Sequence, residues 1–174
     1  YLELTDNTTD PGIDLVIWPE TVVALDFSKS RGHPQPLIDL AHEHDIEILY
    51  GARVKKGNQL YNSIVHYHSE QKKPDRYDKI RLVPFVEFFP AEHLLNKLMQ
   101  IDLLLGSYST GQEITIFEVK NKPLAGIICF ESYFGDHTRL FAKQGAKHLF
   151  VLTNDAWFEQ TIGLDMHAQA AAIR

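Results

Sequence analysis

Cysteine is nearly absent from this chain of 174 residues, and Cys129 is its single one. An internal disulfide is therefore excluded, and with it the disulfide frameworks of small secreted domains. The chain also lacks any apolar run that approaches the roughly 18 residues needed to cross a bilayer. Basic residues are in deficit, with 17 Lys and Arg against 23 Asp and Glu, so no nucleic-acid partner is expected.

The composition that remains is that of a folded domain, with 44% hydrophobic, 23% charged and 11% aromatic residues. The length suits one domain, or a piece of a larger one. The chain opens at Tyr1 without a methionine or a signal peptide, and it closes in segment 165–174, an alanine-rich helix without a stop signal. We therefore expect a fragment that is incomplete at both ends.

Hydrophobic patterning predicts an alternation of strands and helices. Apolar runs rich in β-branched residues predict buried strands at 15–18, 46–50, 127–130 and 149–152. Two alternating segments predict less buried or edge strands at 60–67 and 114–119. Helical spacing predicts helices at 36–44, 91–105 and 135–143. Strands separated by helices indicate an α/β layered domain with a largely buried sheet.

Glu20 is the first candidate for chemistry, because it follows Pro19 where the first predicted strand runs out. Active sites of α/β sheets tend to lie at such strand ends, where partial desolvation raises the pKa of a carboxyl group toward that of a useful general base. The alternative is a carboxylate that interacts with the dipole of the next helix. The residue alone does not separate the two interpretations.

Lys79 is the second candidate, in a locally basic stretch for which a solvated charged face is the ordinary interpretation. The abrupt change into the apolar segment 82–86 favours a buried position instead. A lysine held there can stabilise an oxyanion or lower the pKa of a nearby thiol. Glu87 is embedded among apolar residues and needs a partner if it is buried, for which Lys79 is a candidate.

Cys129 is the third candidate, at the end of an apolar strand and just before Glu131 and Ser132 at the start of a turn. A single cysteine is most often a small buried hydrophobe. A strand-to-turn position, however, can present a nucleophile beside backbone N–H groups. Cys129, Glu20 and Lys79 then form a coherent set of nucleophile, base and charge stabiliser.

The combination resembles the nitrilase (carbon–nitrogen hydrolase) superfamily, whose catalytic set is Glu, Lys and Cys in this chain order. More narrowly, it resembles the catalytic domain of the bacterial apolipoprotein N-acyltransferase family. The resemblance is carried by Trp-Pro-Glu-Thr at 18–21, Tyr-Asp-Lys at 77–79, Leu-Val-Pro-Phe at 82–85, Ile-Cys-Phe-Glu at 128–131 and Thr-Asn-Asp-Ala-Trp-Phe at 153–158. The Leu-Val-Pro-Phe and Asn-Asp-Ala-Trp-Phe elements favour the acyltransferase branch over soluble amidases.

This resemblance implies a nitrilase-like α-β-β-α sandwich, with residues 1–174 as a partial catalytic domain and the flanking transmembrane helices outside the chain. By position, it implies Glu20 as the general base, Lys79 as the transition-state stabiliser and Cys129 as the nucleophile. It implies substrate-binding or supporting roles for Glu87, Glu131, Tyr77, Asn154 and Trp157. Further core strands before and after the chain are also implied, so we expect the isolated chain to be at best weakly active.

Two positions depart from the family pattern, since Val86 and Glu159 stand where glycine is usual. A positive φ at either position would strain the backbone, the valine in particular. Trp157 and Phe158 either line an acyl-chain pocket or simply pack in the core. Asn154 and Asp155 either cap the following segment or orient groups of the site.

The activity that the resemblance implies is acyl transfer without a cofactor. A phospholipid would donate the acyl chain and the diacylglyceryl-cysteine of an apolipoprotein would accept it, on the periplasmic face of the bacterial inner membrane. Two alternatives remain open at this point. One is a soluble amidase of the same superfamily that acts on a small amide or nitrile, and the other is a non-catalytic binding or structural domain.

Nine histidines raise the question of a metal site. His66 and His68 would share one face of a strand, which permits ligation, whereas His42 and His44 on a helix would not share a face. No cluster of Cys and His has zinc-site spacing, so we expect exposed or hydrogen-bonded histidines and no metal.

Overall fold

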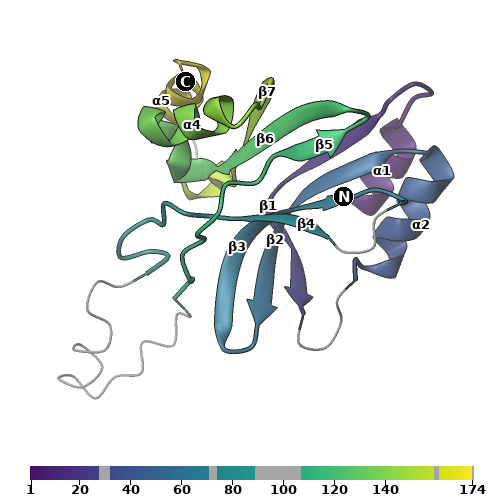
Figure 1. Cartoon of the computed structure of the whole chain (residues 1–174), viewed down its shortest axis with the longest axis horizontal. Coiled ribbons are helices and arrows are strands. Elements are labelled where there is room, and N and C mark those ends of the chain that lie inside the picture. Colours follow the sequence, from purple (N-terminus) through teal and green to yellow (C-terminus); the bar gives the residue numbers. More distant parts are fainter. Residues whose placement is uncertain (28–31, 71–73, 89–106, 159–160, 174) are drawn as a thin grey trace.

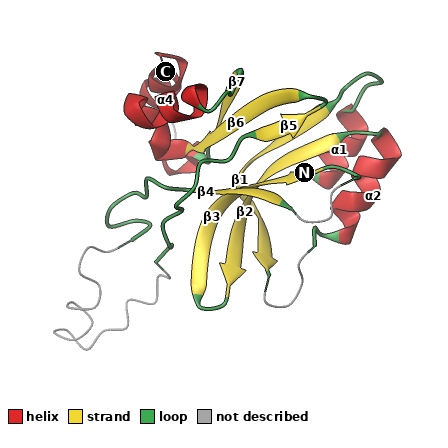
Figure 2. Ribbon diagram, viewed as in Figure 1, coloured by secondary structure: helices red, strands yellow, loops and turns green. Residues whose placement is uncertain are grey.

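The structure is a computed structural model, and it describes residues 1–27, 32–70, 74–88, 107–158 and 161–173. The predicted helix at 91–105 and Glu159 lie outside these ranges. Two β-sheets and several flanking helices make up the described part of the chain (Figures 1 and 2).

The first sheet has four strands in the order β1-β2-β3-β4. These strands are β1 (Leu15–Asp26), β2 (Glu47–Lys56), β3 (Gln59–Tyr67) and β4 (Asp75–Asp78). β1 pairs with β2 in parallel, and the other two pairings are antiparallel. The second sheet contains β5 (Phe117–Val119), β6 (Lys122–Ile128) and β7 (His148–Leu152) in that order, with β5 antiparallel and β7 parallel to β6.

Helices α1 (Leu2–Thr8) and α2 (Gln35–His44) lie beside the first sheet, and α4 (Gly135–Lys143) and α5 (Gly163–Ile173) lie at the second sheet (Figure 1). Two short 3₁₀ helices, η1 (Cys129–Tyr133) and η2 (Asp155–Phe158), follow β6 and β7. Within the described ranges, no helix combines the length and the apolar character that crossing a bilayer requires.

Two hydrophobic clusters fix the order of the layers. In the first cluster, Leu37 and Leu40 of α2 pack against residues of the first sheet such as Val65. In the second, Leu49 and Ile64 of the first sheet meet residues of the second sheet and of α4, namely Phe117, Ile127 and Phe141. The layers therefore run helix, sheet, sheet, helix, which is the α-β-β-α arrangement that the family resemblance implies.

The prediction of a less buried or edge strand at 60–67 is wrong, because β3 is a buried central strand. The strand lies between β2 and β4, and its residues 62–67 are all buried. The neighbour that covers its edge, β4, has the sequence Asp-Arg-Tyr-Asp, which carries no hydrophobic pattern to announce a strand. The second alternating segment, 114–119, forms a strand only at its end, where β5 (Phe117–Val119) lies at the border of its sheet as an edge strand.

β1 is also longer than predicted, since it continues past Trp18 to Asp26. Its register with β2 shifts between Trp18 and Val23, and Thr21 within this stretch has a left-handed φ of 55°. Such a bulge bends a strand and redirects its side chains. Glu20 therefore does not follow the strand but lies at an irregularity inside it.

Candidate active site

Glu20 is nearly buried at the bulge of β1, with a side chain 10% exposed. The side-chain amide of Asn62 donates a 2.7 Å hydrogen bond to its Oε1, and the backbone N–H of Asn154 donates a 3.0 Å bond to its Oε2. Burial raises the pKa of Glu20 above its ordinary value, although Lys79 and Asn62 oppose the change. A carboxylate with a raised pKa is suited to accept a proton near neutral pH.

Lys79 lies beside Glu20 and is almost fully buried. Its Nζ lies 3.0 Å from Oε1 and 2.9 Å from Oε2 of Glu87, and 3.8 Å from Oε1 of Glu20. Lys79 is thus in direct contact with Glu87, for which it is the partner predicted from the sequence. A buried ammonium group thus lies between two carboxylates, which offsets the cost of burying all three charges.

Glu87 is held by neutral donors as well. Asn62 Nδ2 donates to its Oε1 at 2.9 Å, and the Val83 N–H donates to its Oε2 at 2.8 Å. The same Asn62 amide thus bridges Glu87 and Glu20. The backbone N–H of Lys79 donates to the backbone carbonyl of Asn62 at 2.8 Å. Asn62 is therefore joined to this cluster through both its side chain and its main chain.

Cys129 is the first residue of η1, directly after β6, and it is half-buried with a free thiol. Its φ of 48° is left-handed, a conformation that L-residues adopt at a cost and that often occurs where a reactive side chain is presented at a sharp strand-to-helix turn. Burial and the negative charge of Glu20 raise the pKa of the Cys129 thiol, while Thr153 and Lys79 act in the opposite direction. The thiol is therefore protonated at neutral pH and needs a base.

Glu131 is fully buried and joins η1 to the segment that carries Lys79. Its carboxylate accepts hydrogen bonds from the Tyr77 hydroxyl at 2.7 Å and from the N–H groups of residues 80, 81 and 128 at 2.8, 3.0 and 2.8 Å. Burial alone would raise its pKa, but hydrogen bonds from His137, the amides and Tyr77 outweigh it and lower the pKa of Glu131. Glu131 is thus a charged anchor within the turn after β6.

Tyr77 lies on β4 and is fully buried, which raises the pKa of its hydroxyl. The hydroxyl also lies 3.0 Å from Nε2 of His137. Asn154 contributes through its backbone N–H, whereas its side chain Oδ1 accepts a 3.4 Å bond from the N–H of Ala156. The side chain of Trp157 lies outside what the structure describes.

Val86 is not among the residues with a positive φ, so the backbone strain considered for this position is not present. The left-handed conformation in this loop belongs to its neighbour Phe85, with a φ of 63°. Both side chains are exposed. A valine at position 86 is therefore compatible with the loop, because the turn places its positive φ one residue earlier.

Three residues near the site were not singled out from the sequence. Asn62 is a polar residue inside an apolar strand, a signal that would find it only once β3 is known to be buried. Tyr108 lies close enough to Glu20 and Glu87 for their charges to raise its pKa, although its burial is the larger cause. His167 lies on α5, and its ring contacts two segments that follow strands β6 and β7.

The ring of His167 is buried and stacks on Tyr133 at a centroid distance of 5.5 Å. Its Nδ1 lies 2.8 Å from the Asp155 carboxylate, and its Nε2 lies 3.2 Å from the Cys129 carbonyl. Cys129, Asp155 and His167 also offer ligand atoms within 4.8 Å of one another. The mutual bonding of Asp155 and His167 favours a structural role, in which α5 supports the backbone of residue 129.

The arrangement can support covalent catalysis. A half-buried thiol, a carboxylate with a raised pKa and a buried ammonium group interact electrostatically, and backbone N–H groups of η1 follow the thiol directly. These groups can in principle remove a thiol proton and stabilise the oxyanion that forms when a thiolate attacks a carbonyl carbon.

Comparison with known proteins identifies the family to which this chain belongs. The family model for carbon-nitrogen hydrolase matches residues 1–174, so the chain belongs to the carbon–nitrogen hydrolase family, that is, the nitrilase superfamily. It is 32% identical to the apolipoprotein N-acyltransferase of Methylococcus capsulatus, over 100% of this chain and 34% of that protein. It is 32% identical to the apolipoprotein N-acyltransferase of Pasteurella multocida, over 92% of this chain and 33% of that protein.

Solved structures share the fold at lower identity. A mutant of the amidase from Nesterenkonia sp. AN1 superposes with a TM-score of 0.63 at 16% identity, over 99% of this chain and 65% of the amidase. A CN-hydrolase superfamily protein from Xanthomonas campestris gives the same TM-score and identity, over 99% and 64% of the two chains. The acyltransferases are longer than these solved chains, and the present chain spans about a third of their length.

Proposed function

We propose that this chain is part of the catalytic domain of an apolipoprotein N-acyltransferase. The observation that carries the proposal is the buried cluster of Glu20, Lys79 and Glu87 beside the Cys129 thiol. Similarity to named acyltransferases over the whole chain supports the choice of reaction. The donor would be a membrane phospholipid, and the acceptor the α-amino group of a diacylglyceryl-cysteine at the N-terminus of an apolipoprotein.

In the first half of the proposed reaction, Glu20 removes the proton of the Cys129 thiol. The thiolate attacks an ester carbonyl of the phospholipid, and Lys79 stabilises the oxyanion, an effect worth about 3 kcal/mol for a well-placed donor. The ester C–O bond then breaks, and the lysophospholipid leaves with the proton from Glu20. A thioester on Cys129 remains, and no cofactor takes part.

In the second half, the acceptor amine attacks the thioester carbonyl. Glu20 accepts the proton that the amine loses, the C–S bond breaks, and Cys129 regains its proton. Glu20 therefore has to be charged and neutral in turn. Its raised pKa reduces the free-energy difference between the two protonation states at neutral pH. Asn62 would hold this carboxylate in place through both halves.

The exposed side chains of Phe85 and Val86, on the loop that carries Glu87, support a lipid substrate, because they offer apolar surface to an acyl chain. The resemblance to the acyltransferase family further suggests a location on the periplasmic face of the bacterial inner membrane. Membrane attachment would then come from segments of the whole protein that this chain does not contain.

The test is the intact mass of the whole protein after incubation with phospholipid, compared between wild type and Cys129→Ala. A gain of one acyl chain that hydroxylamine removes, and that the variant does not acquire, would support the thioester. Addition of a diacylglyceryl-cysteine peptide should then transfer the chain to its amine. An exposed-site variant such as His148→Gln serves as the matched control and should be acylated normally.

A small-amide hydrolase is the second candidate, supported by the shared fold with the Nesterenkonia amidase. Folded protein that gains no acyl mass but releases ammonia from small amides, in a Cys129-dependent manner, would replace the acyltransferase proposal with this one. Folded protein with neither activity and with a thiol inert to alkylating reagents would instead indicate a non-catalytic domain.

A further inference from the structure

A second group of polar side chains lies farther along β3. His66 is four residues beyond Asn62, about 13 Å along an extended strand. Asp75 on β4 is paired directly with His66 across the antiparallel ladder, so the two side chains leave the same face of the sheet. His68 continues the alternation of β3 by two residues and lies on this face as well.

The ladder brings these three side chains within ligation distance. His66, His68 and Asp75 each offer one ligand atom, and the three atoms lie within 4.8 Å of one another. The centroids of the two imidazole rings are 5.3 Å apart. Such spacing lets a single ion contact all three groups, since bonds from a transition metal to nitrogen or oxygen ligands are about 2.0–2.2 Å long.

His66 has an unpaired nitrogen at this place. Its side chain is fully buried, and its Nε2 lies 2.8 Å from Oε2 of Glu47. A carboxylate only accepts hydrogen bonds, so Nε2 carries the proton and Nδ1 keeps a lone pair. Among the residues that the structure describes, no group lies within hydrogen-bond reach of Nδ1. A buried unpaired nitrogen is costly, and a cation would satisfy it.

The contact with Glu47 matches the surroundings of a typical metal-binding histidine, in which a carboxylate holds the ring through its other nitrogen. The remaining face of the ring packs edge-on against Phe117 at a centroid distance of 5.9 Å. The ring is therefore fixed in place and in tautomer.

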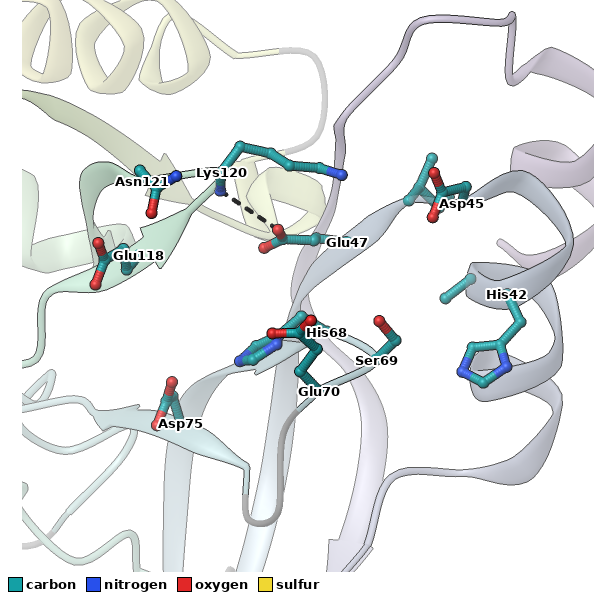
Figure 3. Close-up of a pocket in the computed structure, with 12 residues that line it drawn as sticks. His42, Asp45, Glu47, His68, Ser69, Glu70, Asp75, Glu118, Lys120 and Asn121 are labelled. Atoms are coloured by element: carbon teal, nitrogen blue, oxygen red, sulfur yellow. Dashed lines mark hydrogen bonds between the residues drawn. The ribbon is translucent and has the colours of Figure 1, made fainter.

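The surroundings give an ion a route from solvent. His68 and Asp75 line a pocket of about 740 Å³, whose lining also includes Glu118 of β5 and Lys120 directly after it (Figure 3). Its lining includes the carboxylates of Asp45, Glu47, Glu70, Asp75 and Glu118. This excess of negative charge attracts cations.

We propose that His66, through Nδ1, together with His68 and Asp75 binds one divalent transition-metal ion of the Zn²⁺ class. Two imidazoles and one carboxylate suit Zn²⁺ or Co²⁺ better than Mg²⁺ or Ca²⁺, which prefer oxygen ligands. Three protein ligands leave a fourth position of a tetrahedral ion open to the pocket. The ion would tie the end of β3 to the start of β4.

The test is a titration of the purified whole protein with Co²⁺, followed by visible absorption of the bound ion. The Cys129→Ser background removes the thiolate that could bind the ion elsewhere. One equivalent should bind. His68→Gln or Asp75→Asn should weaken the affinity by at least about tenfold, because mutation of even the outer partners of metal ligands has an effect of this size. His148→Gln on β7, an exposed histidine far along the chain, should bind like its parent.

Thermal unfolding with and without Zn²⁺ gives a second readout that is independent of activity. The Tm of the Cys129→Ser protein should rise with Zn²⁺, and the rise should be lost in His68→Gln and Asp75→Asn. Folded parent protein that binds no Co²⁺, or variants that bind it as tightly as the parent, would overturn the proposal. Neither His68 nor Asp75 is buried, so both variants are expected to fold.

Discussion

Gly51 of β2 lies against the backbone of Glu20. A methyl group at residue 51 would come within 2.5 Å of the Glu20 Cα and would also collide with the carbonyl oxygen of Pro19. The close approach coincides with the register shift of β1 between Trp18 and Val23. The position of the Glu20 carboxylate therefore depends on the absence of a side chain on the neighbouring strand.

Gly51→Ala should displace the β1 bulge and with it Glu20. We expect a loss of about 1–3 kcal/mol in the free energy of unfolding from overpacking, and a fall in kcat/KM of up to about 100-fold from the misplaced carboxylate. Chemical denaturation and acyl-transfer kinetics measure the two effects. Gly32→Ala is the matched control, because a methyl group there meets no atom within 4 Å. Equal activity of the two variants would contradict the role of the bulge.

Asn62→Leu should change the pH dependence of the reaction. The Asn62 hydrogen bond lowers the pKa of Glu20, so its loss raises that pKa further above the ordinary value. Glu20 accepts a proton only when it is ionised, and kcat/KM therefore falls as the pH drops through its pKa. The acidic limb of the pH profile should move to higher pH.

The control for this shift is Asn58→Leu, at an exposed turn residue, which should keep the wild-type profile. A profile of Asn62→Leu that is merely lower at every pH, with an unmoved acidic limb, would show that Asn62 acts on the fold and not on the ionisation of Glu20.

Much of the layered fold can be predicted from local patterns, because apolar runs and helical spacing are properties of short segments. The runs at 46–50 and 149–152 correspond to parts of β2 and β7, which carry the expected β-branched residues. The bulge at Glu20 could not be predicted in this way. It depends on the contact with Gly51, which comes from a strand about 30 residues away in the sequence.

The same limit applies to the polar groups around the site. The pairing of Lys79 with Glu87 spans only eight residues and can be inferred from a charged residue in an apolar segment. The hydrogen bonds from Asn62 to Glu20 and Glu87 depend on the register of β3. Local sequence patterns do not predict that register. Asp75 likewise joins His66 and His68 only through β4, a strand without a hydrophobic pattern.

Lys79→Met should be strongly destabilising, because it leaves the carboxylates of Glu20 and Glu87 buried without their cation. Removal of one partner of a buried ion pair typically costs about 3–5 kcal/mol. The double variant Lys79→Met with Glu87→Gln should recover part of this loss, since one stranded charge is removed. Acyl transfer should stay abolished in both variants if Lys79 stabilises the oxyanion.

A double-mutant cycle of Lys79→Met and Glu87→Gln, measured by urea denaturation, gives the coupling energy between Lys79 and Glu87. The exposed pair of Arg81 and Asp136, 3.2 Å apart, offers the comparison, and Arg81→Met should cost less than about 1 kcal/mol. A coupling between Lys79 and Glu87 as small as this would contradict a buried charge cluster.

Glu131→Gln should lower stability in a pH-dependent way. The folded pKa of Glu131 lies below its ordinary value, so the charged carboxylate contributes stability above the pKa of the unfolded chain. This contribution is lost as the pH falls through the folded pKa. At neutral pH we expect the free energy of unfolding of the variant to be lower by about 2–3 kcal/mol. The glutamine side chain is uncharged, and its NH2 group stands where the surrounding N–H and O–H donors need an acceptor.

The difference between wild type and Glu131→Gln should therefore shrink as the pH falls below the ordinary range for a glutamate, since the wild-type carboxylate is then protonated too. Urea denaturation at a series of pH values measures it. Glu113→Gln, at an exposed position, should follow the wild type throughout. A Glu131→Gln deficit that stays constant down to strongly acidic pH would mean that lost packing, and not the charge of the carboxylate, accounts for its effect on the turn that carries Cys129.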